Sequence, residues 1–252
     1  MSTIEIKNLT KRYGEAEVLS NINMKLESGK IYGLVGRNGS GKTMLMKHIL
    51  GFVKATQGTI LINGKVVGEN DDMQENIGAI IENPGFLPEY SGFTNLKLLA
   101  MIQGKIKDEQ IKDAIRLVGL DPESKKAVGK YSLGMRQRLG LAQALMENPD
   151  ILLLDEPTTF LDISYQIEIL DLLTELNQKK GTTIAMVLHD INLSARYADY
   201  IFAISNGKLL AHGTPEEIIN EEIIREVYGL NSKIIKDPIT QRPMIIPIGK
   251  CK

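Results

Sequence analysis

The feature that most constrains this chain is a glycine-rich octet placed between an apolar run and a helix-forming run. The octet consists of Gly36, Arg37, Asn38, Gly39, Ser40, Gly41, Lys42 and Thr43. The run before it, Ile31–Val35, is typical of a buried strand, and Met44–Leu50 has helical composition. Glycines let successive backbone N–H groups converge on an anion at a helix N-terminus. The sequence therefore predicts a loop that binds the phosphates of a nucleoside triphosphate, rather than an accidental glycine-rich turn.

Several side chains are suited to phosphate chemistry. Lys42 can reach the β- and γ-phosphates, and the Thr43 hydroxyl can ligate Mg²⁺. Further along, the apolar strand Ile151–Leu154 ends in the acids Asp155 and Glu156. Asp155 is placed to hold Mg²⁺ through water, and Glu156 could orient or deprotonate the attacking water. Such acids alone could simply cap a helix, but together with the octet they favour Mg²⁺-dependent hydrolysis of a nucleoside triphosphate.

Composition indicates which partners and which cellular setting to expect. The chain has 252 residues and a formal charge of -1, so it has no general basic surface and nucleic acid is not an expected partner. Its one cysteine, Cys251, cannot form an internal disulfide, which fits a reducing, cytosolic setting. No apolar run approaches the ~18 residues of a membrane span, so any spanning segments would belong to other chains.

Hydrophobic periodicity predicts the elements. Residues 1–30 alternate with period two, which is typical of half-buried strands, and Asn63-Gly64 is a strong hairpin signal. We expect this antiparallel region to surround the strand before the octet. Residues 93–146 are predicted to be mostly helical. The apolar runs Ile151–Leu154 and Thr183–Leu188, with a helix-like stretch between them, indicate a parallel core. The predicted fold class is an α/β P-loop NTPase core with an antiparallel β subdomain and an inserted α-helical subdomain.

A second motif indicates the family. In the segment Tyr131–Arg138, Ser132 could cap the helix that follows. The segment also resembles the signature motif of ABC ATPases, in a variant with Leu133 and Met135 where many members have glycine and glutamine. This resemblance covers nearly the whole chain and implies a Mg²⁺-dependent ATPase, the ATP-binding subunit of an ABC transporter. In such a subunit, Ser132 and Gly134 would contact ATP.

Other parts of the family pattern follow in order. Tyr13 resembles the aromatic residue that stacks on adenine. Phe160-Leu161-Asp162 resembles the D-loop, which assigns Asp162 to the nucleotide site, and His189 resembles the switch histidine that contacts the γ-phosphate. The resemblance implies a head-to-tail dimer, in which ATP lies between the octet of one subunit and Ser132 of the other. It also implies a separate transmembrane permease, to which the protein binds at the cytoplasmic face of the cell membrane.

One position departs from the pattern. Where most ABC ATPases carry the Q-loop glutamine, this chain has Glu82, within the segment Ile80–Pro84. A carboxylate can still ligate Mg²⁺, although it also brings negative charge near the γ-phosphate. We expect Glu82 to couple the site to Mg²⁺ and to the membrane partner. The alternative is a solvated loop acid.

The resemblance also indicates an organisation of the chain. We expect residues 1–84 and 136–213 to form the nucleotide-binding core, with its antiparallel β region. Residues 85–135 would form the helical subdomain that carries the signature motif. Residues 214–252 would form a C-terminal extension, which begins with a capping box at Thr214–Glu217 and ends in a hairpin.

The two parts of the chain resemble different branches of the family. Before about residue 150 the chain looks like the ATPases of bacitracin and lantibiotic exporters, and after it like those of iron-siderophore, haem and cobalamin importers. The segments that carry the first resemblance are Ile77–Phe86 and Tyr131–Met135; those that carry the second are Glu156–Ser164, Leu188–Ser194 and Arg225–Pro243. The chain is therefore either a mosaic, natural or engineered, with a junction near residues 150–156, or one lineage that mixes these variants.

Three other functions share parts of this sequence pattern. A P-loop kinase or GTPase would not carry the Ser132 signature. A soluble ABC ATPase of DNA repair would need coiled-coil heptads, and one of translation would usually have two ATPase units; the sequence shows neither. A role in iron–sulfur assembly is harder to distinguish from transport on sequence alone. A mosaic could bind nucleotide without having a transport substrate.

Overall fold

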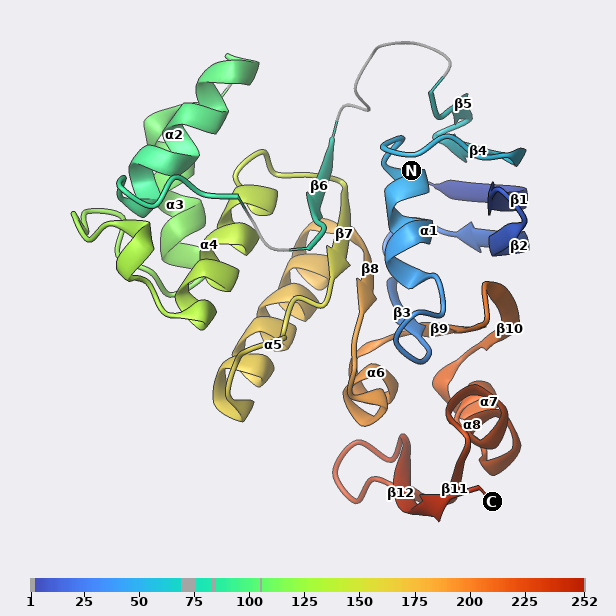
Figure 1. Ribbon diagram of the computed structural model, residues 1–252. Helices are drawn as coiled ribbons and strands as arrows, with labels where there is room; N and C mark the ends of the chain where they lie inside the picture. Colours follow the sequence, from blue (N-terminus) through green and yellow to red (C-terminus); the bar gives the residue numbers. More distant parts are fainter. Residues whose placement is uncertain (1–2, 69–75, 83–84, 105, 252) are drawn as a thin grey trace.

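A six-stranded sheet forms the centre of the protein (Figure 1). The structure is a computed structural model, and it describes residues 3–68, 76–82, 85–104 and 106–251. The sheet has the order β10-β9-β3-β8-β7-β6, and all neighbours are parallel except β10 and β9. Its strands are β3 (Ile31–Val35), β6 (Ile77–Ile80), β7 (Ile151–Asp155), β8 (Thr183–Val187), β9 (Tyr200–Ser205) and β10 (Lys208–Gly213). Every residue of β3, β7 and β8 is buried, as expected for parallel strands covered on both faces.

A second, antiparallel sheet contains four strands in the order β2-β1-β4-β5. They are β1 (Ile4–Tyr13), β2 (Ala16–Leu26), β4 (Gln57–Ile62) and β5 (Lys65–Val66). The predicted hairpin is confirmed: Asn63 and Gly64 have φ of 54° and 79°, as the tight turn between β4 and β5 requires. The expectation that this region surrounds the strand before the octet is wrong, because β3 pairs with β8 and β9 instead. A strand buried on both faces pairs within the parallel sheet, whereas half-buried strands form a sheet with one solvent-exposed face.

Helices cover the sheet and extend it to one side. The helices predicted over residues 93–146 are confirmed as α2, α3 and α4, which pack together to the left of β6 in Figure 1. The helix α5 connects β7 to β8, and this confirms the predicted strand–helix–strand unit. The helices are α1 (Lys42–Ile49), α2 (Gly92–Gln103), α3 (Asp108–Leu117), α4 (Leu133–Leu145), α5 (Ile163–Lys180) and α6 (Ile191–Tyr197), with a 3₁₀ turn at Val128–Lys130.

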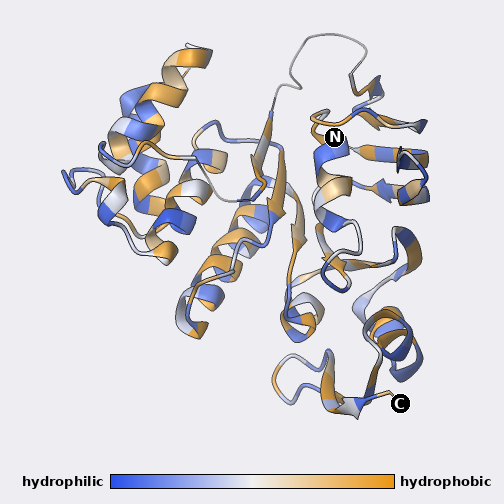
Figure 2. Ribbon diagram, in the orientation of Figure 1, coloured by the Kyte–Doolittle hydropathy of each residue, from blue (hydrophilic) through white to orange (hydrophobic). Residues whose placement is uncertain are grey.

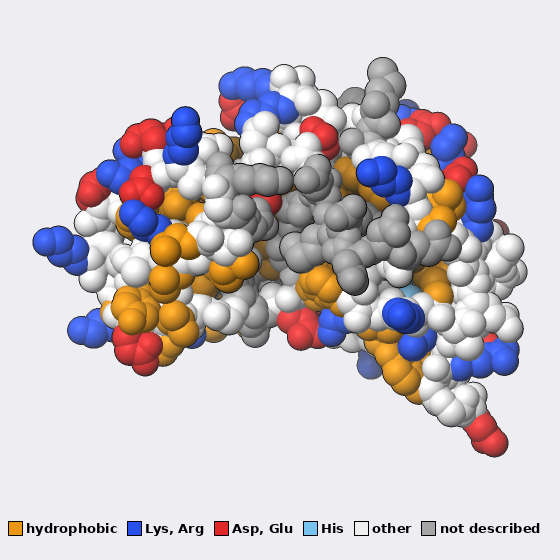
Figure 3. All heavy atoms as spheres, turned by 90° about the horizontal axis from the view of Figure 1, so that it is seen from above, with side chains coloured by type: hydrophobic (Ala, Val, Ile, Leu, Met, Phe, Trp, Pro, Cys, Tyr) orange, Lys and Arg blue, Asp and Glu red, His pale blue; other side chains and the backbone are white. Residues whose placement is uncertain are grey.

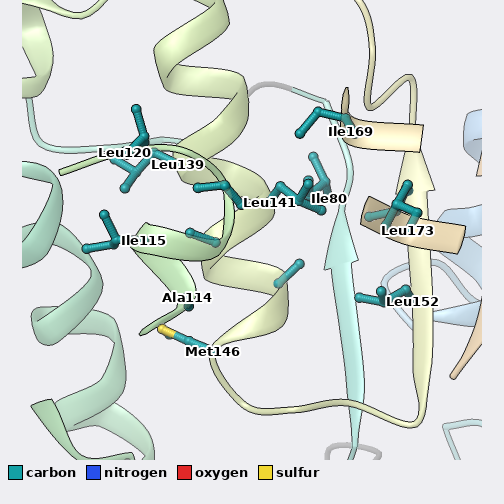
Figure 4. Packing of buried hydrophobic residues seen from close by; sticks show 14 of the residues in the cluster. Ile80, Ala114, Ile115, Leu120, Leu139, Leu141, Met146, Leu152, Ile169 and Leu173 are labelled. Carbon is teal, nitrogen blue, oxygen red and sulfur yellow. The ribbon is translucent and has the colours of Figure 1, made fainter. Parts of the chain in front are cut away.

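One hydrophobic core joins the two parts of the chain that resemble different branches. Ile80 and Leu141 pack with Leu152 and Leu173 across residue 150, and all four are at most 4% exposed (Figure 4). Figure 2 shows the same apolar band along the central strands and the inner faces of the helices. A pocket between the C-terminal ends of α3, α4 and α5 has a volume of about 20 Å³, room for about one water. The mosaic stays a prediction.

Residues 214–251, which we call the C-terminal extension, pack against α6 and against β9 and β10 at one edge of the parallel sheet. The extension comprises α7 (Pro215–Ile218), α8 (Glu221–Tyr228) and the antiparallel hairpin of β11 (Leu230–Lys236) and β12 (Pro243–Lys250). The capping box at Thr214 is confirmed, and Gly229, with φ of 66°, ends α8. Within the described ranges, no helix combines the length and the apolar character that crossing a membrane requires.

Candidate active site

The parallel sheet brings the predicted site residues to one edge. Gly36 follows β3, Asp155 ends β7, and His189 lies just after β8, and these three strands are neighbours. In an open α/β sheet, ligands bind at the carboxyl ends of the strands, where the loops converge. Residues far apart in the sequence therefore meet beside the N-terminus of α1.

The glycine-rich octet has a backbone that side chains would obstruct. Gly36 has φ of 149°, and a Cβ on it would stand 2.1 Å from the carbonyl oxygen of Ile204. Gly41, with φ of 104°, is the N-cap of α1 and supplies no capping side chain. The first turn of α1 also carries no acidic residue. Its N–H groups and the positive end of the helix dipole are therefore available to an anion.

Lys42 is held inside the loop. Its Nζ donates to the carbonyl oxygens of Gly36 and Arg37 at 2.8 and 3.0 Å, and the residue is only 6% exposed. Burial lowers the pKa of Lys42, while the charges of Glu156 and Asp155 oppose that shift. An ammonium so placed would exchange loop carbonyls for phosphate oxygens when a nucleotide binds.

Asp155 is a buried carboxylate that lacks a partner on one side. It is 6% exposed, and its Oδ1 has no hydrogen-bond partner within the described residues. Burial raises the pKa of Asp155, and a hydrogen bond with the Thr43 side chain opposes this shift. Both side chains line a cavity of about 280 Å³, whose other lining residues are Glu82, Gln137, Glu156, Thr159 and Phe160.

The oxygen donors around this cavity fit Mg²⁺, which prefers carboxylate, hydroxyl and water oxygens. Asp155 and Thr43 would hold the ion, with Glu82 on the same cavity wall. The described residues contain no group of three or more His, Cys, Asp or Glu side chains that could hold a metal by itself. Phosphate oxygens and water would have to complete the coordination, as is usual for Mg²⁺ bound with a nucleotide.

Glu156 is fixed by contacts on both sides. His189 Nε2 lies 2.8 Å from its Oε1, and the Thr159 hydroxyl donates to its Oε2 at 3.3 Å. The Gln137 side chain donates to the backbone oxygen of Glu156 at 3.1 Å, and φ of Glu156 is 56°, an unusual value for a non-glycine residue. Thr159 and Gln137 were not predicted as supports of Glu156. A hydroxyl residue three positions after the acid was the available signal for Thr159. Gln137 lies in the segment that resembles the signature motif, but nothing in the sequence indicated its bond to the backbone of Glu156.

Glu82 lies on the cavity wall and is paired with α1. Its Oε1 lies 2.5 Å from Lys47 Nζ, and φ of Glu82 is 61°. The pair links the loop after β6 to the helix that carries Thr43. The last two residues of the segment that resembles the Q-loop, Asn83 and Pro84, lie outside the described residues.

The residues that resemble the signature motif and the D-loop lie on other elements. Ser132 caps α4, where its Oγ accepts the Met135 N–H at 3.2 Å. Gly134 allows close packing, because a Cβ there would stand 3.0 Å from Leu161 Cδ2. Asp162 caps α5 by accepting the Tyr165 N–H at 3.1 Å.

Tyr13 lies at the exposed end of β1, with its hydroxyl 4.0 Å from Met44 Sδ and Lys11 Nζ 4.7 Å from its ring centre. Across the described part of the chain, no hydrogen bond joins Tyr13, Ser132 or Asp162 to the residues that line the cavity. The single chain thus brings together the octet, Glu82, Asp155, Glu156 and His189. From the segment that resembles the signature motif it adds Gln137, whereas Ser132 and Gly134 do not line the cavity.

Comparison with known proteins agrees with this site. The family described as ABC transporter matches residues 19–159. The chain is 36% identical to the achromobactin transport ATP-binding protein of Dickeya dadantii, covering 100% of this chain and 97% of the relative. It is 38% identical to the petrobactin import ATP-binding protein of Bacillus anthracis (98% and 94% covered) and 42% identical to the bacitracin transport ATP-binding protein of Enterococcus faecalis (82% and 68%).

Solved structures show the same fold. A dimeric ATP-binding cassette in a post-hydrolysis state, bound to ADP and Pi, superposes with a TM-score of 0.77 at 26% identity, covering 84% of this chain and 98% of that one. The predicted fold class is thereby confirmed. The glycine-rich octet, the buried acid beside it and these relatives lead to one conclusion: the chain belongs to the ABC transporter family, as an ATP-binding subunit that hydrolyses ATP with Mg²⁺.

Proposed function

We propose that Glu156 is the general base of ATP hydrolysis and that His189 holds its carboxylate in place. The observation that carries this proposal is the 2.8 Å contact between His189 Nε2 and Glu156 Oε1, beside the buried Asp155. A water between Glu156 and the γ-phosphate would lose a proton to Glu156 and attack phosphorus, and the bond to the ADP oxygen would break. The octet N–H groups and Lys42 would hold the phosphates. Mg²⁺, when bound with ATP through Thr43 and Asp155, would neutralise phosphate charge.

The complete site needs a second subunit. Ser132 caps α4 and Gly134 lies in its first turn, and neither lines the cavity beside the octet. A second copy arranged head to tail would bring them to the γ-phosphate. Asp162 and the exposed Phe160 would lie at the same interface, and Tyr13, half exposed at the end of β1, would stack on adenine. This arrangement is supported by the dimeric form of the similar cassette.

The helical region is the proposed contact with a separate permease. The chain would divide into a nucleotide-binding core (1–84 and 136–213), a helical subdomain (85–135) and the extension (214–252). Figure 3 shows hydrophobic side chains gathered over the helical region. On α2, Leu98, Met101 and Ile102 are 40%, 68% and 82% exposed, which is unusual for adjacent apolar residues on a helix. A permease would cover them and hold the protein at the cytoplasmic face of the membrane.

Two transport substrates are supported by different relatives. The relatives named for achromobactin and petrobactin transport match the chain over 98–100% of its length, which favours import of iron carriers. The bacitracin relative is more identical, at 42%, but matches 82% of the chain, and it favours export. Deleting the gene in its own host separates the two. Loss of growth on a ferric siderophore would support import, and increased sensitivity to bacitracin would support export.

The test of the catalytic proposal is the Mg²⁺-ATPase rate measured against protein concentration. We expect a rate that rises more than linearly and falls about 10²–10⁴-fold in Glu156→Gln, because the general base is lost while the side chain keeps its shape. Glu175→Gln, which removes an exposed acid on α5 paired with Lys179, should leave the rate unchanged. A Glu156→Gln variant that retained the wild-type rate would rule out Glu156 as the base.

A further inference from the structure

The C-terminal extension touches the phosphate-binding octet directly. Tyr228, the last residue of α8, accepts a hydrogen bond from the Gly36 N–H at 3.0 Å through its hydroxyl, although the two residues are 192 positions apart. The carbonyl oxygen of Gly36 accepts from Lys42 at 2.8 Å. Both the N–H and the carbonyl oxygen of Gly36 are therefore hydrogen-bonded, and the extension binds the N–H. Burial raises the pKa of Tyr228 to about 12, so its hydroxyl stays neutral at any physiological pH.

The same extension holds the helix that follows His189. Asn192, in the first turn of α6, exchanges two hydrogen bonds with the backbone of Ile245 on β12, at 2.8 and 3.2 Å. At the other end of α6, Arg242 donates to the carbonyl oxygens of Ala195 and Ala198 at 3.1 and 2.5 Å. The hairpin thus fixes α6 at both ends, and α6 begins only two residues after His189.

We propose that the C-terminal extension is a positioning element of the ATPase site, in which Tyr228 positions the octet for nucleotide and Asn192 positions His189 through α6. The proposal rests on the catalytic function proposed for Glu156 and His189. The two contacts have different consequences. A free Gly36 peptide can rotate, so a nucleotide must order it on binding, and this weakens affinity. A displaced α6 moves His189 away from Glu156, and misplacement of catalytic groups lowers the chemical rate.

The octet contact is tested with Tyr228→Phe, which removes only the hydroxyl. We expect the dissociation constant for ADP with Mg²⁺, measured by titration calorimetry on the full chain, to rise about 10-fold, which corresponds to ~1.4 kcal/mol. At saturating ATP, kcat should stay within about 2-fold, since His189 and Glu156 are untouched. Tyr32→Phe is the matched control: its buried hydroxyl also accepts a backbone N–H, that of Glu27 at 2.5 Å, but makes no contact with the octet. The control should lower the melting temperature and leave ADP affinity unchanged.

The α6 contact is tested with Asn192→Ala. We expect kcat to fall about 10-fold while ADP affinity stays within about 2-fold, the reverse of the Tyr228→Phe pattern. Asn192→Asp keeps an acceptor for the Ile245 N–H and should recover part of the rate. Asn177→Ala is the matched control, because Asn177 also bonds a backbone oxygen, that of Thr182 at 2.8 Å, but lies on α5. It should leave both kcat and affinity unchanged.

His189→Ala separates failure of this inference from failure of the proposed function. If His189→Ala abolishes hydrolysis while Asn192→Ala and Tyr228→Phe lower only the melting temperature, as their controls do, the extension is merely structural and the inference is overturned. If His189→Ala keeps the wild-type rate, the catalytic proposal fails, and with it the α6 part of the inference. The inference is supported if Tyr228→Phe loses ADP affinity but not kcat, and Asn192→Ala loses kcat but not ADP affinity.

Discussion

Asp155 should destabilise the protein as long as no nucleotide is bound. Its carboxylate is 6% exposed and its Oδ1 has no partner within the described residues, and an unsatisfied buried acceptor costs about 1–3 kcal/mol. Asp155→Asn removes the charge and keeps the shape. We expect the free energy of unfolding of the nucleotide-free protein to increase by about 1 kcal/mol at neutral pH, which corresponds to a rise of about 2–4 °C in melting temperature.

The pH dependence of this effect follows from the raised pKa. Burial raises the pKa of Asp155 in the folded protein, so the unfolded chain loses this proton at a lower pH than the folded chain does. Stability therefore falls as pH rises from the ordinary Asp value of about 3.9 through the folded pKa, and the penalty is fully present above it. The gain in unfolding free energy from Asp155→Asn should be largest at neutral pH and should shrink as pH falls toward ~4.

Denaturant titrations at several pH values, with and without ADP and Mg²⁺, test this reasoning. Ligand at a 100-fold excess over its dissociation constant stabilises wild type by about 2.7 kcal/mol, and the variant should gain much less. Asp237→Asn is a control of opposite sign, because the N–H groups of Thr240 and Ile239 lower the pKa of this partly exposed acid. That variant should lose stability at neutral pH. An Asp155→Asn protein that is less stable than wild type without nucleotide, or whose advantage does not depend on pH, would refute the argument.

Three further predictions concern other positions. Gly36→Ala should lower the melting temperature and abolish ADP binding, because its Cβ would lie 2.1 Å from the backbone oxygen of Ile204; calorimetry and thermal melts check this, and unchanged binding would contradict it. Glu82→Gln should raise the Mg²⁺ concentration for half-maximal ATPase activity, while losing its exposed pair with Lys47 changes stability by less than about 1 kcal/mol. Unchanged Mg²⁺ dependence and rate would remove Glu82 from the metal site. Burial lowers the pKa of His48, so stability should fall as pH drops below its ordinary value of about 6.5, and His48→Gln should flatten that fall in melts across this range.

The groups suited to nucleotide chemistry and the local turns could be predicted from the sequence. The octet, the acids after Ile151–Leu154 and the turn at Asn63-Gly64 are contiguous, and each depends on backbone geometry that only certain residue types permit. The capping box at Thr214 is equally local. The fold class followed from the period of the apolar residues, because a strand buried on both faces and a half-buried strand need different patterns.

Which elements become neighbours was decided only by the tertiary structure. The sequence did not indicate that β3 lies between β8 and β9, because strand order depends on how all the apolar faces are buried together. The same holds for the support of Glu156 by Gln137, and for the bond from Gly36 to Tyr228. A hydrogen bond between residues 192 positions apart leaves no periodicity in the chain, since neither residue type requires the other. The sequence by itself thus determined which groups could handle a nucleotide, and the packing of distant elements decided what holds those groups in place.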